Sequence, residues 1–281
     1  TLEYRLNSEE ISAIFTERGG LLRELDYWPA KFNLLNSVRR YRESYHERVA
    51  NASLSMHKNG SIHEQLVAKE KGLEQLLAVD QAPRFAFLDR FFSAEMPVHD
   101  LKKQFPEEGN FLTRVFQVNQ TKDLIFTACG SAFGKKAKLI KTIVLEGNTI
   151  QLNVEIRNED YEPIEGWYGN EMNLSLLGGH TPDRYYEING KRPRRSYLDS
   201  TGAEKKVREI ALINSWDRFR VIIRFQDPAS IWRFPLETVT MSESGLERIY
   251  QSSVLIPYWR LELKPGQAFM TTFTLGVESM Q

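Results

Sequence analysis

The amino-acid sequence predicts an all-β protein, a large antiparallel β-sandwich with a few short peripheral helices. Apolar and polar residues alternate strictly in the second half of the chain, which is typical of strands with one buried and one solvent-exposed face. Turn-forming pairs that contain glycine, asparagine or proline separate these runs, and no helix of crossover length lies between them. These features favour antiparallel sheets packed face to face.

The first strands are expected at Ile11–Phe15 and Leu21–Tyr27, on either side of a glycine pair. The rest of the first third has mixed periodicity, and short helices are expected at Tyr41–Val49, Lys69–Val79 and Val98–Phe105. Neither an internal repeat nor a low-complexity linker appears, so we expect residues 1–281 to form a single domain.

The alternation is clearest in Ile150–Arg157 and Phe269–Val277. A third alternating run ends at Leu263 and leads into Phe269–Val277 through Lys264–Gln267. That link contains Pro-Gly, which suits a type II turn, so a terminal hairpin is expected. Further turns are expected at Gly147-Asn148, Asn189-Gly190, Thr201-Gly202, Asp227-Pro228 and Ser244-Gly245.

Composition excludes several classes of partner. Lys plus Arg and Asp plus Glu are 37 each among 281 residues, so no net charge favours nucleic acid or an anionic membrane. The basic run Lys191–Arg195 contains a proline and is interpreted as a solvated loop. No apolar run approaches the length of a membrane span. Because there is no disulfide pair and no signal peptide, we expect a cytoplasmic protein.

Cofactor and metal motifs are not found. His46-Glu47 and His63-Glu64 begin like a zincin motif, but Ala50 and Val67 stand where the second histidine is required. The nucleophile elbow, the phosphate-binding loop and the dinucleotide fingerprint are also absent from the sequence. Neither a metal nor a cofactor is therefore expected. The single cysteine, Cys129, lies between strand-like runs and is interpreted as a buried structural thiol rather than a nucleophile.

Glu171 is the strongest candidate for sugar chemistry. It follows Trp167 and Tyr168, whose rings could stack on a pyranose, and a carboxylate paired with a histidine could transfer protons at the sugar ring. Weaker members of such a group are His63, His46 and Asp89. The alternative is that Glu171 is a strand residue hydrogen-bonded at the rim of a sheet, and the sequence leaves both interpretations open.

The segment Glu24–His46 is unusually rich in arginine, tyrosine and tryptophan. If its end is helical, pairs such as Arg39 with Glu43 contribute only about 0.2–0.5 kcal/mol each at an exposed face. Arginine and tyrosine are, however, favoured in desolvated interfaces. Two interpretations of this segment therefore remain: it forms an interface with another domain, or it is an ordinary solvent-exposed surface.

The order of several short motifs resembles a known family, the C-terminal domain of glycoside hydrolase family 57, in its 4-α-glucanotransferase and α-amylase branch. The motifs run in the order Gly19-Gly20, Glu24-Leu25-Asp26, Asn33 with Asn36, Arg39-Arg40, Glu43-x-Tyr45-His46, Ser61-Ile62-His63-Glu64 and Arg84–Phe92. One departure is Arg90, which follows Asp89 where the family tends to have histidine.

The resemblance implies a galactose-mutarotase-like supersandwich that packs against an N-terminal catalytic barrel. In the family, that barrel holds a glutamate nucleophile and an aspartate acid/base. The strand–helix alternation of a barrel is absent here, so no residue of this chain is expected to be catalytic. The first residue is Thr1 rather than methionine, which fits an excised C-terminal domain.

Three hypotheses follow. The first is a non-catalytic domain of an α-glucan-active hydrolase or 4-α-glucanotransferase, whose partners are the catalytic barrel of the same polypeptide and an α-glucan or maltooligosaccharide. Its contacts with sugar or barrel are expected among Trp28, Arg39, Arg40, Glu43, His46, Asp89 and Trp167. The second is a free-standing mutarotase-like enzyme that uses Glu171 and a histidine such as His63 at C1 of an aldose. The third is a carbohydrate-binding module with an exposed aromatic platform.

Overall fold

The computed structural model describes residues 2–44, 46–47, 73–102, 105–242 and 245–280. Their strands form two sheets, and the neighbouring strands that pair in these described residues are all antiparallel, as the alternation predicts. The smaller sheet runs in chain order: β1 (Glu3–Asn7), β2 (Ile11–Thr16), β3 (Leu21–Tyr27) and β4 (Phe32–Asn33).

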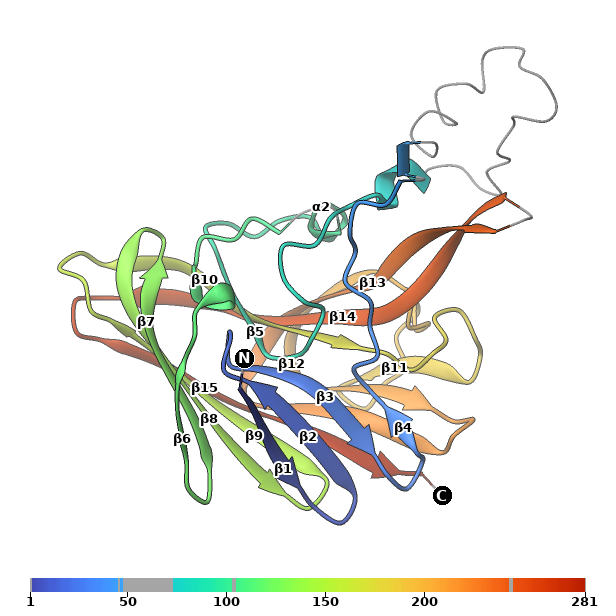
Figure 1. Cartoon of the computed structure of the whole chain (residues 1–281), viewed down its shortest axis with the longest axis horizontal. Coiled ribbons are helices and arrows are strands. Elements are labelled where there is room, and N and C mark those ends of the chain that lie inside the picture. The colour runs from blue at the N-terminus through green and yellow to red at the C-terminus, as the bar shows by residue number, and fades with distance from the viewer. Residues whose placement is uncertain (1, 45, 48–72, 103–104, 243–244, 281) are drawn as a thin grey trace.

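The strands of the larger sheet do not follow one another in chain order (Figure 1). In spatial order its path is β5 (Leu88–Phe92), β10 (Ile164–Leu174), β14 (Gly245–Leu263), β13 (Phe219–Ser242), β15 (Ala268–Ser279), β9 (Thr149–Asn158), β8 (Lys135–Glu146), β7 (Leu124–Ala132) and β6 (Gln117–Gln120). Off this path, β12 (Gly202–Asn214) pairs with β13, and β11 (Arg184–Ile188) pairs with β12.

The two sheets share one hydrophobic core. Tyr27 and Phe32 from the smaller sheet contact Phe219 of β13, with ring centroids 5.7 and 5.0 Å apart. Phe15 of β2 contacts Phe126 of β7 at 6.2 Å. Figure 1 shows the small sheet lying across the strands of the large one, so the predicted face-to-face β-sandwich is confirmed.

The helices are short and peripheral, also as predicted. The structure has a 3-10 turn η1 (Leu73–Leu76), a helix α2 (Val98–Leu101) and a 3-10 turn η2 (Phe111–Thr113). Of the segment expected to be helical at Tyr41–Val49, only residues 46 and 47 are helical within the described part, and residues 69–72 of the next expected helix lie outside it.

The expected terminal hairpin is wrong, although its turn forms. Gln267 N donates to Lys264 O at 3.0 Å, and Gly266 has the positive φ of 77° that a type II turn requires. The strands on either side nevertheless do not pair with each other: β14 pairs with β10 and β13, and β15 pairs with β9 and β13. The 24-residue strand β13 is long enough to pair with both in succession, and this inserts it between them.

The turn expected at Asp227-Pro228 is also wrong, because β13 continues through it. The pairing of β13 with β15 ends at Phe225, and its pairing with β14 begins at Ser230. Pro228 lies in this gap. No partner strand requires a backbone N–H there, so the missing N–H of proline costs no hydrogen bond between strands. By contrast, the expected turn at Asn189-Gly190 is confirmed, with φ of 49° and 71°.

Cys129 corrects another expectation, because its side chain is exposed rather than buried. It occupies an outward position of β7, and its Sγ lies 3.9 Å from Glu159 Oε2. Leu124, Phe126 and Ala128 are buried at every second position before it, so the alternation of the strand directs Cys129 to solvent.

A fully buried lysine ties three segments together. Lys141 of β8 is 0% exposed, and its Nζ donates to Gly19 O at 2.8 Å and Phe87 O at 2.9 Å. The same ammonium lies 2.7 Å from Asp89 Oδ2 on β5. Burial lowers the pKa of Lys141, and the Asp89 carboxylate opposes that shift. The glycine turn of the small sheet, the entry to β5 and the centre of β8 are therefore held by one charged group.

Replacing Lys141 by methionine leaves the Asp89 carboxylate buried without its cation. We expect K141M to lower the free energy of unfolding by about 3–5 kcal/mol, because an uncompensated buried charge remains. The double variant K141M/D89N removes both charges and keeps an acceptor for Tyr168 Oη, so it should lose less than K141M. Urea denaturation measures both. The exposed pair Arg23–Glu3 is the control: R23Q should cost less than about 1 kcal/mol. A K141M protein as stable as wild type would contradict this account.

Candidate functional site

Strand β10 places Glu171 beside β5. The register pairs Glu171 with Leu88 and Gly169 with Arg90. Because side chains alternate along a strand, Glu171 and Gly169 point to the same face of the sheet. Arg90 stands opposite Gly169, which has no side chain, and reaches diagonally to Glu171.

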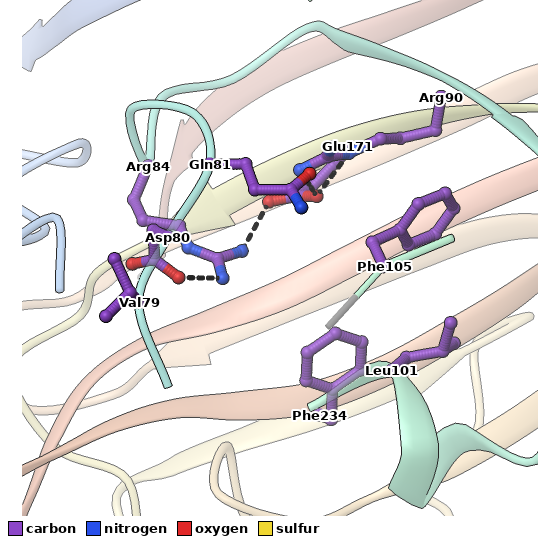
Figure 2. Close-up of a pocket in the computed structure, with 9 residues that line it drawn as sticks. All are labelled: Val79, Asp80, Gln81, Arg84, Arg90, Leu101, Phe105, Glu171 and Phe234. Carbon is purple, nitrogen blue, oxygen red and sulfur yellow. Dashed lines mark hydrogen bonds and ion pairs between the residues drawn. The ribbon is translucent and has the colours of Figure 1, made fainter. Parts of the chain in front are cut away.

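Two arginines hold the Glu171 carboxylate, one on each oxygen (Figure 2). Arg84 Nη1 donates to Oε1 at 2.8 Å, and Arg90 lies on Oε2 with Nε at 2.9 Å and Nη2 at 2.7 Å. Asn173 Nδ2 also donates to Oε1, at 2.9 Å. Glu171 is 1% exposed, so these donors replace water around the carboxylate.

The ion pairs continue from both arginines. Arg84 Nη2 lies 2.5 Å from Asp80 Oδ1, and Arg40 donates to the same oxygen from Nη2 at 2.7 Å. At the other end, Arg90 Nη1 lies 3.3 Å from Glu107 Oε2. We call this set the charge chain; its members, in order and with alternating sign, are Arg40, Asp80, Arg84, Glu171, Arg90 and Glu107.

The charge chain also holds loop backbone. Asp80 Oδ2 accepts from Arg40 N at 2.8 Å, and Asp80 N donates to Arg40 O at 3.0 Å. Glu107 Oε1 accepts from the backbone N of Phe91 at 3.0 Å and of Gly109 at 2.9 Å. Asp80 therefore joins two irregular segments to each other, and Glu107 attaches its own loop to β5.

Asp80 and Glu171 of the charge chain are anions, whereas burial raises the pKa of Glu107 to about 7 against the opposing charge of Arg90. Burial alone would raise the pKa of Glu171, but the charges of Arg90 and Arg84 outweigh burial and lower its pKa to about 2. Burial would likewise raise the pKa of Asp80, yet hydrogen bonds and charge from Arg84 and Arg40 lower it to about 2. Glu171 and Asp80 are therefore very weak bases, which is the opposite of what proton abstraction at neutral pH requires.

The hollow at this network is small. It has a volume of about 20 Å³, which is room for about one water molecule. Figure 2 shows Phe105, Leu101 and Phe234 on one side of it, and Phe105 packs against Arg90, whose Cζ lies 4.9 Å from the ring centroid. The residues that line it are Val79, Asp80, Gln81, Arg84, Arg90, Leu101, Phe105, Glu171 and Phe234, and no histidine is among them.

The expected contact residues are spread over several places. Arg40 is buried in the charge chain, and Asp89 is buried on the opposite face of β5, where it accepts from Tyr168 Oη at 2.7 Å. Arg39 donates to Asp80 O at 3.0 and 3.1 Å. Trp167 stacks on Phe92 with ring planes 7° apart.

The remaining expected residues lie nearer the surface. Glu43 N donates to His46 Nδ1 at 3.2 Å in an exposed turn, and Trp28 is half exposed at the tip of the β3–β4 hairpin. His63 falls outside the described residues. Which of these side chains contact sugar or a second domain stays a prediction.

Four members of the charge chain, Asp80, Arg84, Arg90 and Glu107, are not among the site residues expected from the sequence. Asp80 and Arg84 stand four apart but lie in a segment that is not helical, so the spacing rule for ion pairs on helices does not predict their contact. Glu107 has no local signal either, because its partner Arg90 is 17 residues away on a separate strand.

Neither a metal site nor a membrane-spanning helix is found among the described residues. No group of three or more His, Cys, Asp or Glu side chains among them could hold a metal ion. Within the same residues, no helix has both the length and the apolar character to cross a membrane.

Comparison with known sequences identifies the family. The family model for the C-terminal region of α-amylase/4-α-glucanotransferase matches residues 1–273, and the chain belongs to this family. Alpha-amylase 1 of Dictyoglomus thermophilum is 32% identical over 270 residues, which are 92% of this chain and 38% of that protein. The 4-alpha-glucanotransferase of Thermococcus kodakarensis is 23% identical over 263 residues, 91% of this chain and 37% of that protein. The chain thus spans less than two fifths of the length of these relatives.

Solved structures show the same fold. The 4-alpha-glucanotransferase of Thermococcus litoralis matches 99% of this chain with 37% of its own, at a TM-score of 0.74 and 18% identity. A putative aldose 1-epimerase from Escherichia coli K12 matches 99% of both chains at a TM-score of 0.59 and 11% identity. The expected galactose-mutarotase-like sandwich is therefore confirmed.

The low pKa values of Glu171 and Asp80 make the free energy of unfolding depend on pH in the acidic range. A group whose pKa is lower in the folded state than in the unfolded state stabilises the fold at pH values above its unfolded-state pKa. This stabilisation is lost as the pH falls towards the folded-state pKa. For Glu171 a fall from 4.5 to about 2 corresponds to roughly 3 kcal/mol at neutral pH. We expect the free energy of unfolding to decrease between about pH 5 and pH 2. E171Q should be less stable at pH 7 but lose stability less steeply over this range.

Urea titrations at a series of pH values measure this slope. E262Q, which changes a glutamate with a 72% exposed side chain, is the matched control and should keep the wild-type slope. If E171Q also keeps the wild-type slope, Glu171 is not the anion that the ion pairs indicate.

Proposed function

We propose that this chain is a non-catalytic domain that packs against a catalytic domain of the same polypeptide, in an enzyme that acts on α-1,4-glucans. The names of the relatives support the substrate class, since they are α-amylases and a 4-α-glucanotransferase. The chain corresponds to 38% of the length of the Dictyoglomus α-amylase, which supports the presence of a second domain in the whole enzyme.

The observation that carries the non-catalytic role is the pairing of Glu171 with two arginines. A mutarotase-like reaction needs a carboxylate and a histidine that converge on the sugar with free lone pairs. Both oxygens of Glu171 accept from arginine, and the hollow beside it holds about one water molecule rather than an aldose. The free-standing epimerase hypothesis thus has only the shared fold in its favour, and fold alone does not carry function.

A surface next to the charge chain suits the docking of a catalytic domain. Val38, Tyr41 and Val79 are each more than half exposed, and we call them the docking patch. Arg39 joins its two segments, because it donates to Asp80 O and its guanidinium lies 5.1 Å from the Tyr41 ring centre. Apolar side chains around a planar cation match the composition of the desolvated centre of protein interfaces.

The isolated chain should be inactive on sugars. We expect no release of reducing ends from starch, no disproportionation of maltotriose and no acceleration of glucose mutarotation by polarimetry. The polypeptide that includes the catalytic domain should carry out one of the first two reactions. Mutarotation that the chain catalyses and E171Q abolishes would instead establish the epimerase hypothesis.

Charged substitutions in the docking patch should weaken domain association. We expect V38D/V79D to reduce the affinity of this chain for a separately produced catalytic domain by about tenfold or more, measured by calorimetry. Tyr161, 93% exposed in the turn between β9 and β10, offers the control Y161D. Both variants should unfold at the same urea concentration as wild type, since surface changes contribute about 0.5 kcal/mol or less. Equal effects of V38D/V79D and Y161D would place the docking surface elsewhere.

A further inference from the structure

We propose that the outer face of the β3–β4 hairpin is a binding subsite for a glucose residue of an α-1,4-linked maltooligosaccharide. The subsite consists of Asp26, Trp28, Lys31 and Asn33. Its geometry comes from the structure, whereas the choice of an α-glucan as ligand rests on the proposed function.

The hairpin separates a buried face from an open one. The register pairs Asp26 with Asn33 and Tyr27 with Phe32. Tyr27 and Phe32 pack inward against Phe219. Because side chains alternate, Asp26 and Asn33 point to the opposite face, and the next outward positions along the hairpin belong to Trp28 and Lys31. An aromatic ring, a carboxylate, an amide and an ammonium group are thereby gathered on one surface.

The backbone under this surface is well fixed. Trp28 N donates to Glu10 O at 2.8 Å, which attaches the tip of the hairpin to the preceding turn. Lys31 N donates to Trp28 O at 3.0 Å and closes the four-residue turn, in which Lys31 has a φ of 52°. A rigid platform loses little conformational freedom when a ligand binds, which favours affinity.

The polar groups are ordered and still have capacity for a ligand. Asn33 Nδ2 donates to Asp26 Oδ1 at 2.8 Å, and Asn33 Oδ1 accepts from Leu35 N at 2.9 Å. No protein partner for Asp26 Oδ2 or for Lys31 Nζ is present among the residues that the structure describes. One acceptor and one cationic donor, placed by the cross-strand pairs, are therefore available to hydroxyl groups.

A hollow lies over these groups. It has a volume of about 350 Å³ and is lined by Asp26, Tyr27, Trp28, Lys31, Phe32 and Asn33. This volume is at the lower end of the range for small-molecule sites. Trp28 is 51% exposed, so a large part of its indole is free to contact a ligand. The hollow beside Glu171, at about 20 Å³, has no comparable room.

The chemistry of the surface matches a pyranose ring. One face of glucose presents mainly C–H groups, which pack on an indole, while its hydroxyl groups both donate and accept hydrogen bonds. Asp26 Oδ2 can accept from two neighbouring hydroxyls, and Lys31 Nζ can donate to a third. Hydrogen bonds to charged groups are stronger than neutral ones, so this pair would orient the ring on Trp28.

Calorimetry of the 281-residue chain with maltoheptaose tests the subsite, with cellopentaose as the β-linked comparison. We expect maltoheptaose to bind, and W28A to weaken its affinity by about tenfold or more because the stacking surface is lost. W216A removes another tryptophan, 77% exposed in the turn between β12 and β13, and should bind as wild type does. D26N and K31Q keep the fold and should each weaken binding by several-fold.

A second readout covers the case in which W28A folds poorly. Maltoheptaose should change the tryptophan fluorescence of wild type and of W216F, and this change should be absent in W28F. Absence of binding to the wild-type chain at millimolar maltoheptaose overturns the subsite, as does equal binding by wild type, W28A and D26N.

The outcomes also separate the subsite from the proposed function. A chain that docks and is inactive alone but does not bind maltoheptaose removes only the subsite. A chain that catalyses a sugar reaction alone removes the non-catalytic role, and the comparison of W28A with W216A still tests the subsite.

Discussion

The central constraint on this structure is that β5 and β10 bury charged groups on both of their faces. Asp89 and Arg90 are consecutive residues of β5, so the alternation of a strand directs them to opposite sides of the sheet. Asp89 meets Lys141 in the core between the sheets, and Arg90 meets Glu171 on the other face. A shift of the β5 register by one residue would exchange these two charges and leave both without partners. The two ion pairs therefore specify one alignment of β5 on β10.

This constraint explains how a mutarotase-like sandwich is compatible with a structural role for Glu171. The face of β10 that carries Glu171 is closed by the segment around α2, whose Leu101 packs with Trp232 and Phe234 of β13. Arg90 of β5 and Arg84 of the loop before it form ion pairs with the Glu171 carboxylate. The same fold can thus present a reactive carboxylate or a buried counter-ion, and the arginines in neighbouring segments determine which of the two it has.

The sequence predicts local features of this structure well and long-range features poorly. Alternation identifies β9 and β15, because the period of a strand depends only on nearby residues. It does not reveal that β13 separates β14 from β15, since the residues that pair these strands are far apart in the chain, from Phe225 with Phe273 to Phe219 with Ser279. Pro228 reads as a turn residue for the same reason: the gap in pairing that accommodates it is a property of three strands. Glu171 stood out by its aromatic neighbours, but its arginine partners lie 81 and 87 positions away. The sequence could therefore suggest that Glu171 matters without showing whether it acts as a base or a counter-ion.

The alternating signs of the charge chain have a consequence for whatever covers it. Asp80 and Glu171 balance two of the three arginines in the chain, and Glu107, whose pKa burial raises to about 7, balances the third once it is ionised. At pH values above the pKa of Glu107, a neighbouring surface laid over the hollow meets a locally neutral region and need not bring ions of its own. Assembly at this place would therefore be governed by shape and apolar area, and moderate changes in ionic strength would affect it little, because screening acts mainly on unbalanced exposed charge.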